Sequence, residues 1–286
     1  MAGPQSGRVR SGDVEIFYRR FGRPGATPVA IQHGLSFFSY DWIGAAEALA
    51  TDREVVALDM RGFGDSDFSP NRDYSLKAFA GDTIALADHL DWREFTLVGH
   101  SMGGRNAAFC AAENPARVKA LVLVDYSPEN APAGSKRVRT QVAGTPDTFE
   151  SIDAAMRYFA KDPDEQANRV RYEAYLREVD GGYAVKRDPH FRDQFRRALE
   201  TGAHPKLGVD MWQVLGRLEC PTLVLRGARS DMFAPETVAK VRAANARIQL
   251  VEIDAGHNVA ADNREGFLAA VRPFLRNLEA RHEQNA

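Results

Sequence analysis

Short runs of aliphatic residues alternate along this chain with longer stretches in which apolar positions recur at helical spacing. Continuous apolar runs are typical of parallel strands that are covered on both faces. We therefore expect buried strands at Val29–Gln32, Glu54–Asp59, Phe95–Gly99, Val118–Val124, Thr222–Leu225 and Ile248–Ile253. Val14–Phe21 follows a Ser-Gly-Asp turn signal and is expected to be the second arm of an opening hairpin. The alternation predicts an α/β fold with a mostly parallel sheet flanked by helices.

The alternation stops between residues 128 and 210. Ile152, Met156 and Phe159 trace one apolar helix face in this segment. Arg169–Val179 is typical of a charged helix, and Phe191–Leu199 resumes a helical pattern. The strand pattern returns at Pro221 as though nothing had intervened. We therefore expect residues 1–127 and 211–286 to form one core domain, with residues 128–210 inserted as a helical cap.

Composition and charge exclude several classes of protein. The 286 residues are 44% hydrophobic and 27% charged, which is ordinary for a globular chain. The 37 basic and 39 acidic residues leave a net charge of −2, so no cationic surface for nucleic acid or anionic lipid is expected. The apolar runs are far shorter than the roughly 20 residues that span a bilayer.

The amino terminus and the cysteines add two expectations. The first ten residues contain no apolar core of a secretory signal, so we expect a cytoplasmic protein. Cys110 and Cys220 form neither a disulfide framework nor a metal-ligand pattern, and both are expected to be buried. We expect no cofactor and no metal, and the oligomeric state stays open.

The segment Gly99-His100-Ser101-Met102-Gly103 carries the strongest chemical signal. It is a G-x-S-x-G motif that lies directly between a predicted strand and a predicted helix. A sharp turn there would project the Ser101 hydroxyl above the sheet, next to the unpaired N–H groups of a helix N-terminus. Ser101 is the candidate nucleophile.

A serine hydroxyl needs a base to accept its proton and a third group to orient that base. His257, in a loop after the last strand, is the candidate base. The acid is expected between the serine and the histidine, at a strand end. Asp231 follows the penultimate strand and is preferred, whereas Asp125, at the end of the strand before the insertion, remains the alternative.

Two backbone N–H groups are expected to stabilise the oxyanion of a tetrahedral intermediate. One belongs to Met102, and the second to Leu35, in the His33-Gly34-Leu35-Ser36 loop. The loop from Asp59 to Ser66 lacks the spacing of a phosphate-binding loop and is expected to be a structural turn. Aromatic residues that flank the loops or the return from the cap are candidates for the substrate pocket: Phe37, Phe38, Tyr126 and Trp212.

With these motifs in their observed order, the chain resembles the α/β-hydrolase superfamily over nearly its whole length. The resemblance rests on His33-Gly34, Asp59-x-Arg61-Gly62-x-Gly64-x-Ser66, the serine motif, Pro221–Gly227 and Gly256-His257. It implies the same nucleophile, base and oxyanion amides. One departure concerns the acid: the family often has it three residues after the strand-ending glycine, where this chain has Ser230, and the aspartate follows one residue later. This departure keeps Asp125 open as the acid.

The leading hypothesis is a serine hydrolase that cleaves a small or medium carboxylic ester or lactone through an acyl-enzyme. A serine at the motif's centre disfavours the relatives that use a carboxylate nucleophile. The alternatives are a cofactor-free haloperoxidase or perhydrolase, a carbon–carbon bond hydrolase with the same triad, and a ligand receptor with little turnover. The expected partner is the small-molecule substrate, without nucleic acid or membrane.

Overall fold

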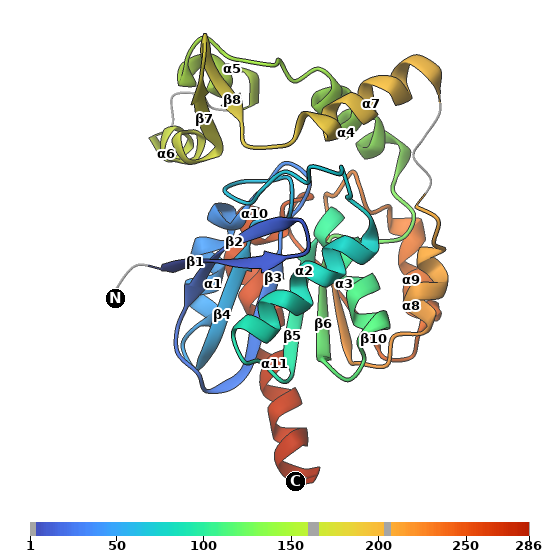
Figure 1. The fold of residues 1–286 in the computed structure, drawn as a ribbon. Helices are drawn as coiled ribbons and strands as arrows, with labels where there is room; N and C mark the ends of the chain where they lie inside the picture. The colour runs from blue at the N-terminus through green and yellow to red at the C-terminus, as the bar shows by residue number, and fades with distance from the viewer. Residues whose placement is uncertain (1–3, 160–165, 203–206, 286) are drawn as a thin grey trace.

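The computed structural model describes residues 4–159, 166–202 and 207–285. Its central feature is an eight-stranded sheet with the order β1-β2-β4-β3-β5-β6-β9-β10 (Figure 1). The first two strands pair antiparallel, as does β2 with β4, and every other pair is parallel. The strands are β1 (Gln5–Ser11), β2 (Val14–Phe21), β3 (Ala26–Gln32), β4 (Arg53–Leu58), β5 (Phe95–His100), β6 (Val118–Val124), β9 (Thr222–Gly227) and β10 (Ile248–Ile253). The predicted α/β fold is confirmed.

Helices cover both faces of the sheet, as the apolar runs of its central parallel strands require. One face packs against α2 (Leu76–His89), α3 (Met102–Glu113), α8 (Met211–Gly216) and α9 (Val238–Ala244). The other face packs against α1 (Ile43–Leu49), α10 (Val259–Asp262) and α11 (Arg264–Asn285), with Trp42 and Phe267 in edge-to-face contact. Among the described residues, no helix is both long and apolar enough to cross a bilayer. Both cysteines are buried free thiols, as expected.

The segment between β6 and α8 forms a separate layer above the carboxyl edge of the sheet (Figure 1). We keep the name cap for this layer, residues 128–210. Its elements are α4 (Pro132–Ala143), α5 (Ile152–Phe159), α6 (Gln166–Tyr175), β7 (Leu176–Val179), β8 (Gly182–Val185) and α7 (Pro189–Thr201). A cluster of aromatic residues joins it to the core, because Phe38 of the core packs against Tyr175 of the cap.

The expectation of one charged helix over Arg169–Val179 is wrong in its second half. The helix ends at Tyr175, and the chain then enters an antiparallel hairpin of β7 and β8. Gly181 and Gly182, with φ of 81° and 139°, make the turn, which side chains with a Cβ would resist. Tyr183 also forms a bridge with Phe149, so pairing with a distant segment stabilises the hairpin.

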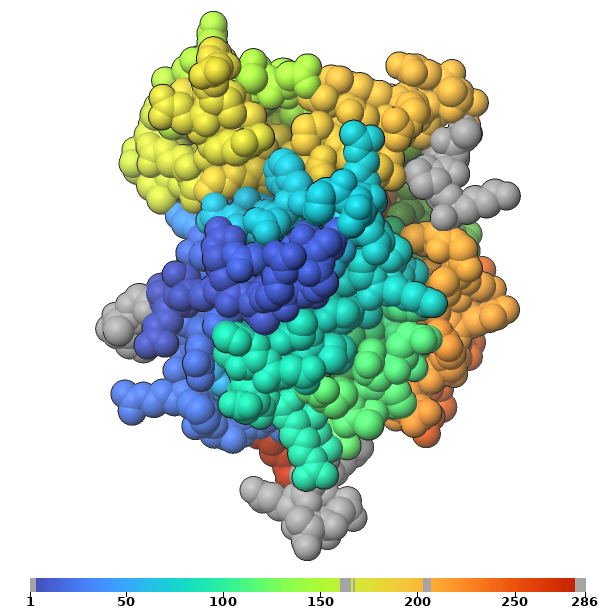
Figure 2. Space-filling view, in the orientation of Figure 1, coloured from blue at the N-terminus to red at the C-terminus, as the bar shows by residue number. Residues whose placement is uncertain are grey.

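Backbone hydrogen bonds attach the cap to the loop that follows β4. The Gly64 N–H donates to the Lys186 carbonyl at 2.7 Å, and the Asp188 N–H donates to the Gly62 carbonyl at 2.8 Å. Lys186 Nζ also lies 2.7 Å from the Asp65 carboxylate. In the space-filling view the yellow and green cap rests on the blue and cyan segments below it (Figure 2). The Asp59–Ser66 loop is thus the turn of the core to which Lys186 and Asp188 of the cap are bonded.

Candidate active site

Ser101 lies at the turn from β5 into α3, as the motif predicts. Its backbone has φ 54° and ψ −115°, a strained conformation for a residue with a side chain. The neighbouring glycines allow the turn to close: a Cβ at Gly99 would collide with the Gly103 carbonyl oxygen, and one at Gly103 with the His33 carbonyl oxygen. The turn therefore presents the Ser101 hydroxyl at the sheet's edge and packs the start of α3 against the end of β3.

His257 lies within hydrogen-bonding distance of Ser101. Its Nε2 is 3.0 Å from Ser101 Oγ, although the two residues are 156 positions apart. The loop after β10 is held by bonds to the loop after β9, where Arg229 N–H donates to the Ala255 carbonyl at 2.9 Å. His100 donates from Nε2 to the His257 carbonyl at 3.0 Å. The imidazole can thus accept the serine proton without moving.

The carboxylate on the other side of the imidazole is that of Asp125. Its Oδ2 lies 2.6 Å from His257 Nδ1, and its Oδ1 accepts from the Gly227 N–H at 2.8 Å. Asp125 is buried at the end of β6, the strand that lies between β5 and β9. The Ser230 hydroxyl also donates to Oδ2. Ser230 therefore occupies the family's usual acid position and supports an acid that comes from β6.

The preference for Asp231 as the partner of the imidazole is corrected by these contacts. The Asp231 carboxylate accepts two hydrogen bonds from Arg137 of the cap, at 2.6 and 2.8 Å, and is partly exposed. The hydrogen bonds from Arg137, together with its charge, lower the pKa of Asp231. The chain turns at Ser230, so the next side chain points to the cap. Asp231 therefore belongs to an ion pair between the core and the cap.

The two candidate oxyanion amides flank the same turn. Met102 is the first residue of α3, and Leu35 lies in the loop after β3. The carbonyl oxygens of Gln32 and His33, just before Leu35, lie against Gly103. Among the described residues, neither the Met102 nor the Leu35 N–H donates to an acceptor. Unpaired backbone N–H groups of this kind are what a developing oxyanion requires.

His33 and His100 lie beneath the site in supporting positions. His33 Nε2 accepts from the Met60 N–H at 2.9 Å, and its Nδ1 donates to the Gly34 carbonyl at 2.8 Å. Burial lowers the pKa of His33 to about 4. Burial, with a smaller contribution from His257, lowers the pKa of His100 to about 3. Both rings stay neutral near pH 7 and hold the loops that carry the site.

The four aromatic residues predicted for a substrate pocket differ in position. Phe37 is partly exposed and packs edge to face on His100, with the ring centroids 5.4 Å apart. Phe38 is fully buried between core and cap, and Tyr126 is buried against Gly104 of α3. Trp212 lies on α8 beneath the Lys240 ammonium, 4.1 Å from the ring centroid. Phe37 is the one of the four that is both partly exposed and in contact with a residue of the serine motif.

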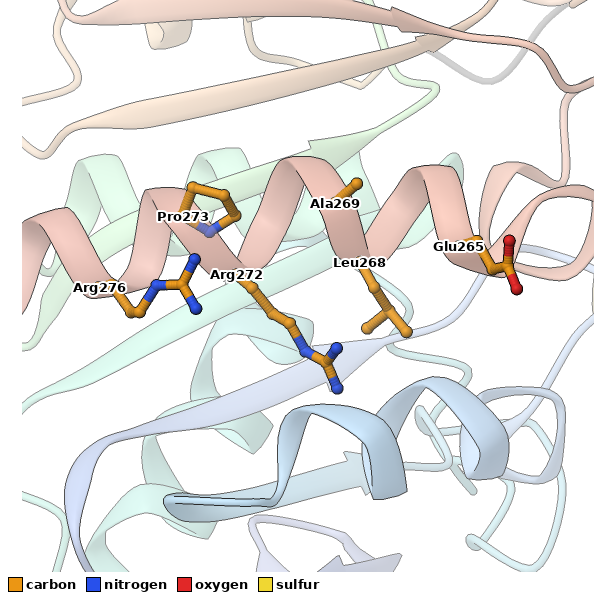
Figure 3. Close-up of a pocket in the computed structure, with 6 residues that line it drawn as sticks. All are labelled: Glu265, Leu268, Ala269, Arg272, Pro273 and Arg276. Carbon is orange, nitrogen blue, oxygen red and sulfur yellow. The ribbon is translucent and has the colours of Figure 1, made fainter.

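Two other features of the described residues concern ligands. A pocket of about 460 Å³ lies along α11 between Glu265 and Arg276, and the Leu268 and Arg272 side chains that line it point toward α1 (Figure 3). None of the residues around Ser101 lines it. Within the described ranges, no group of three histidine, cysteine or acidic side chains is placed to hold a metal ion.

Comparisons with known proteins bear on the fold. A family model described as the alpha/beta hydrolase fold matches residues 27–263. The chain is 28% identical to a 3-hydroxybutyrate-oligomer hydrolase of Cupriavidus necator, over 90% of this chain and 92% of that protein. It is also 28% identical to the N-formylmaleamate deformylase of Pseudomonas putida, over 94% and 96%. The solved structure of an E-2-(acetamidomethylene)succinate hydrolase superposes with a TM-score of 0.82 at 26% identity, covering 96% and 99%.

Proposed function

This chain belongs to the alpha/beta hydrolase fold family, and from that premise we propose that it is a serine hydrolase acting on a small or medium carboxylic ester or lactone. The observation that carries the proposal is the line of contacts from Asp125 through His257 to Ser101, at 2.6 and 3.0 Å. Hydrogen bonds of this kind, in this order, are what a serine needs to act as a nucleophile.

In the proposed reaction, the Ser101 oxygen attacks the acyl carbon while its proton passes to His257 Nε2. Asp125 accepts the Nδ1–H bond, which keeps Nε2 free as the acceptor and stabilises the imidazolium once it forms. The imidazolium then gives its proton to the leaving oxygen, and an acyl-serine remains. Water, deprotonated by the same histidine, attacks the acyl-serine, releases the acid and restores the hydroxyl.

The Leu35 and Met102 N–H groups would bind the carbonyl oxygen as it becomes an oxyanion. They are backbone groups on a packed loop and a helix N-terminus, so they would need no reorganisation when charge develops. We further propose that the cap, residues 128–210, limits which acyl chains reach Ser101, because it lies over this edge of the sheet (Figure 1).

A small carboxylic amide is a second candidate substrate. Two similar proteins are named a deformylase and an acetamidomethylene-succinate hydrolase, whereas another is named an oligomer hydrolase. The same serine, histidine and oxyanion donors serve ester and amide cleavage. The leaving group would receive the histidine's proton on nitrogen instead of oxygen.

The test combines covalent labelling with turnover. Wild-type protein is treated with a serine-directed fluorophosphonate and assayed on short p-nitrophenyl esters, on lactones and on N-formyl amides. We expect labelling at Ser101, burst release of nitrophenol, and loss of both in Ser101→Ala. Ser127→Ala is a matched control, because Ser127 is buried nearby and bonds the Glu129 carbonyl.

Several results would count against the proposal. Absence of labelling together with absence of turnover on all three substrate classes would defeat it. Ligand-dependent thermal stabilisation without turnover would favour a receptor instead. Peroxide-dependent halogenation that needs Ser101 would favour a haloperoxidase on the same residues.

A further inference from the structure

Arg187 differs from four other arginines that are almost fully buried in the described part of the chain. Five arginine side chains are almost fully buried among the described residues, and four of them face carboxylates: Arg53 with Asp52 and Glu279, Arg61 with Asp82 and Asp13, Arg192 with Asp147 and Asp193, and Arg226 with Glu252. Arg187, 3% exposed, faces no carboxylate in the described part of the chain. With respect to the described residues, it is a buried cation without a counter-ion.

The partners of the Arg187 guanidinium are neutral hydroxyls. Its Nη1 lies 3.5 Å from Ser36 Oγ, and its Nη2 lies 3.2 Å from Thr145 Oγ1. Arginine bonds to carboxylates are shorter, about 2.7–2.9 Å. Burial lowers the pKa of Arg187, Tyr175 and Tyr158 oppose this shift, and the positive charge of Arg192 adds to it. A guanidinium nevertheless stays protonated, so the positive charge is present and poorly compensated.

The position of this cation relates it to the candidate active site. The Arg187 backbone lies in the cap segment that bonds to the Gly62–Gly64 loop, and its side chain reaches toward Ser36. Ser36 follows Leu35, the residue whose N–H is a candidate oxyanion donor. Arg171 also approaches the Ser36 carbonyl, at 3.4 Å, but Asp41 neutralises it at 2.6 Å. Of the charges that the structure describes beside this loop, Arg187 is therefore the one without a compensating carboxylate.

Burying an ion without a partner is strongly unfavourable. A buried guanidinium without a carboxylate partner therefore indicates that a bound ligand supplies the counter-ion. We propose that Arg187 binds a free carboxylate of the substrate, which makes the substrate a half-ester, half-amide or lactone of an acid with at least two carboxyl groups. The inference rests on the proposed function, because it places the scissile carbonyl at Ser101. The carboxylate would accept hydrogen bonds from both the guanidinium and the Ser36 hydroxyl.

The turnover experiment compares monomethyl with dimethyl esters of succinic, glutaric and adipic acids, by following methanol release. The variants are Arg187→Met, which keeps the length and removes the charge, and Arg187→Lys, which restores it. Arg196→Met is the matched control, because Arg196 also lies in the cap and bonds the Ala143 and Thr145 carbonyls. Labelling of Ser101 by a neutral fluorophosphonate is measured on every variant.

We expect wild-type kcat/KM to favour one or more of the monoesters over its diester by at least about tenfold, the value of one charge-assisted hydrogen bond. Arg187→Met should lose that ratio but keep diester cleavage and Ser101 labelling. Arg187→Lys should recover part of it, and Arg196→Met should match the wild type. Equal cleavage of both ester types by the wild type, or an unchanged ratio in Arg187→Met, would overturn the inference while the hydrolase proposal stands.

A measurement of ligand binding by thermal shift tests the inference without turnover. Glutarate at fixed ionic strength should raise the Tm of the wild type, whereas the neutral diamide should not, and Arg187→Met should respond to neither. Failure of the wild type to respond would contradict the inference. If Ser101 is not labelled but the glutarate response depends on Arg187, the anion site survives and the hydrolase proposal fails.

Ligand-free stability separates binding from a structural role. A residue that merely joins Ser36 to Thr145 would lower the Tm when replaced by methionine, without any effect on the ester ratio. Removal of an uncompensated buried charge should leave the Tm unchanged or raise it.

Discussion

Replacement of Asp125 by asparagine tests the contact network at the centre of this site. The amide keeps the shape of the carboxylate, and its oxygen can still accept from the Gly227 N–H. It removes the negative charge that lies 2.6 Å from His257 Nδ1. It can also present an NH₂ group to Nδ1, which would turn Nδ1 into the acceptor and place the ring's proton on Nε2, facing Ser101.

The magnitude follows from the charges that form during the reaction. When the serine proton reaches Nε2, an imidazolium and the Asp125 carboxylate face each other with charge centres about 4 Å apart. At an effective dielectric constant of about 20 the attraction is about 4 kcal/mol, or roughly a thousandfold in rate. The wrong tautomer adds to this loss, so we expect kcat to fall by about 10³ to 10⁴.

The assay is burst and steady-state kinetics on a p-nitrophenyl ester, with the Tm of each variant as a check on folding. Asp231→Asn is the control, because Asp231 forms a partly exposed pair with Arg137. Such a pair stabilises by at most about 1 kcal/mol, so activity should change by at most about fivefold. A folded Asp125→Asn within tenfold of the wild type would refute the reasoning, as would an equal loss in Asp231→Asn.

Three further predictions concern stability. Ser101→Gly should be more stable than Ser101→Ala by about 1 kcal/mol in urea unfolding, because φ is 54° and glycine relieves the strain; the opposite order would show an unstrained turn. Because burial lowers the pKa of His33 to about 4 and of His100 to about 3, from 6.5, the unfolded chain binds more protons below about pH 6.5. Stability should therefore be full above that pH and fall toward pH 4, and His100→Gln should flatten the profile of Tm against pH; an unchanged profile would contradict this. Tyr126→Phe should raise the free energy of unfolding by about 1 kcal/mol, because the buried hydroxyl has no partner among the described residues, and a loss of stability would reveal one.

Much of the fold and part of the site follow from local patterns. Strands β5 and β6 are continuous apolar runs, and α3 begins at Met102 and ends at the residue before Asn114-Pro115. The serine motif determines its own sharp turn, because its glycines make contacts that no larger residue could make. A residue's own neighbours determine these features, so a single stretch of sequence predicts them.

The hairpin of the cap required more than local pattern. The segment Leu176–Val179 is compatible with a continued charged helix in sequence. It forms a strand instead, in a hairpin whose Tyr183 pairs with Phe149. The two segments are far apart in sequence. Local propensity could not show that they meet.

Local sequence patterns were enough to predict the alternation of strands and helices, the strained turn at Ser101, and the histidine that would serve it. Tertiary contacts were needed to show that Asp125 and not Asp231 reaches that histidine, because β6 lies beside the serine's strand while the turn at Ser230 directs Asp231 to Arg137. They also show that Arg187 is buried without a carboxylate partner among the described residues. Both facts depend on which distant segments lie side by side, and a linear pattern contains no such distances.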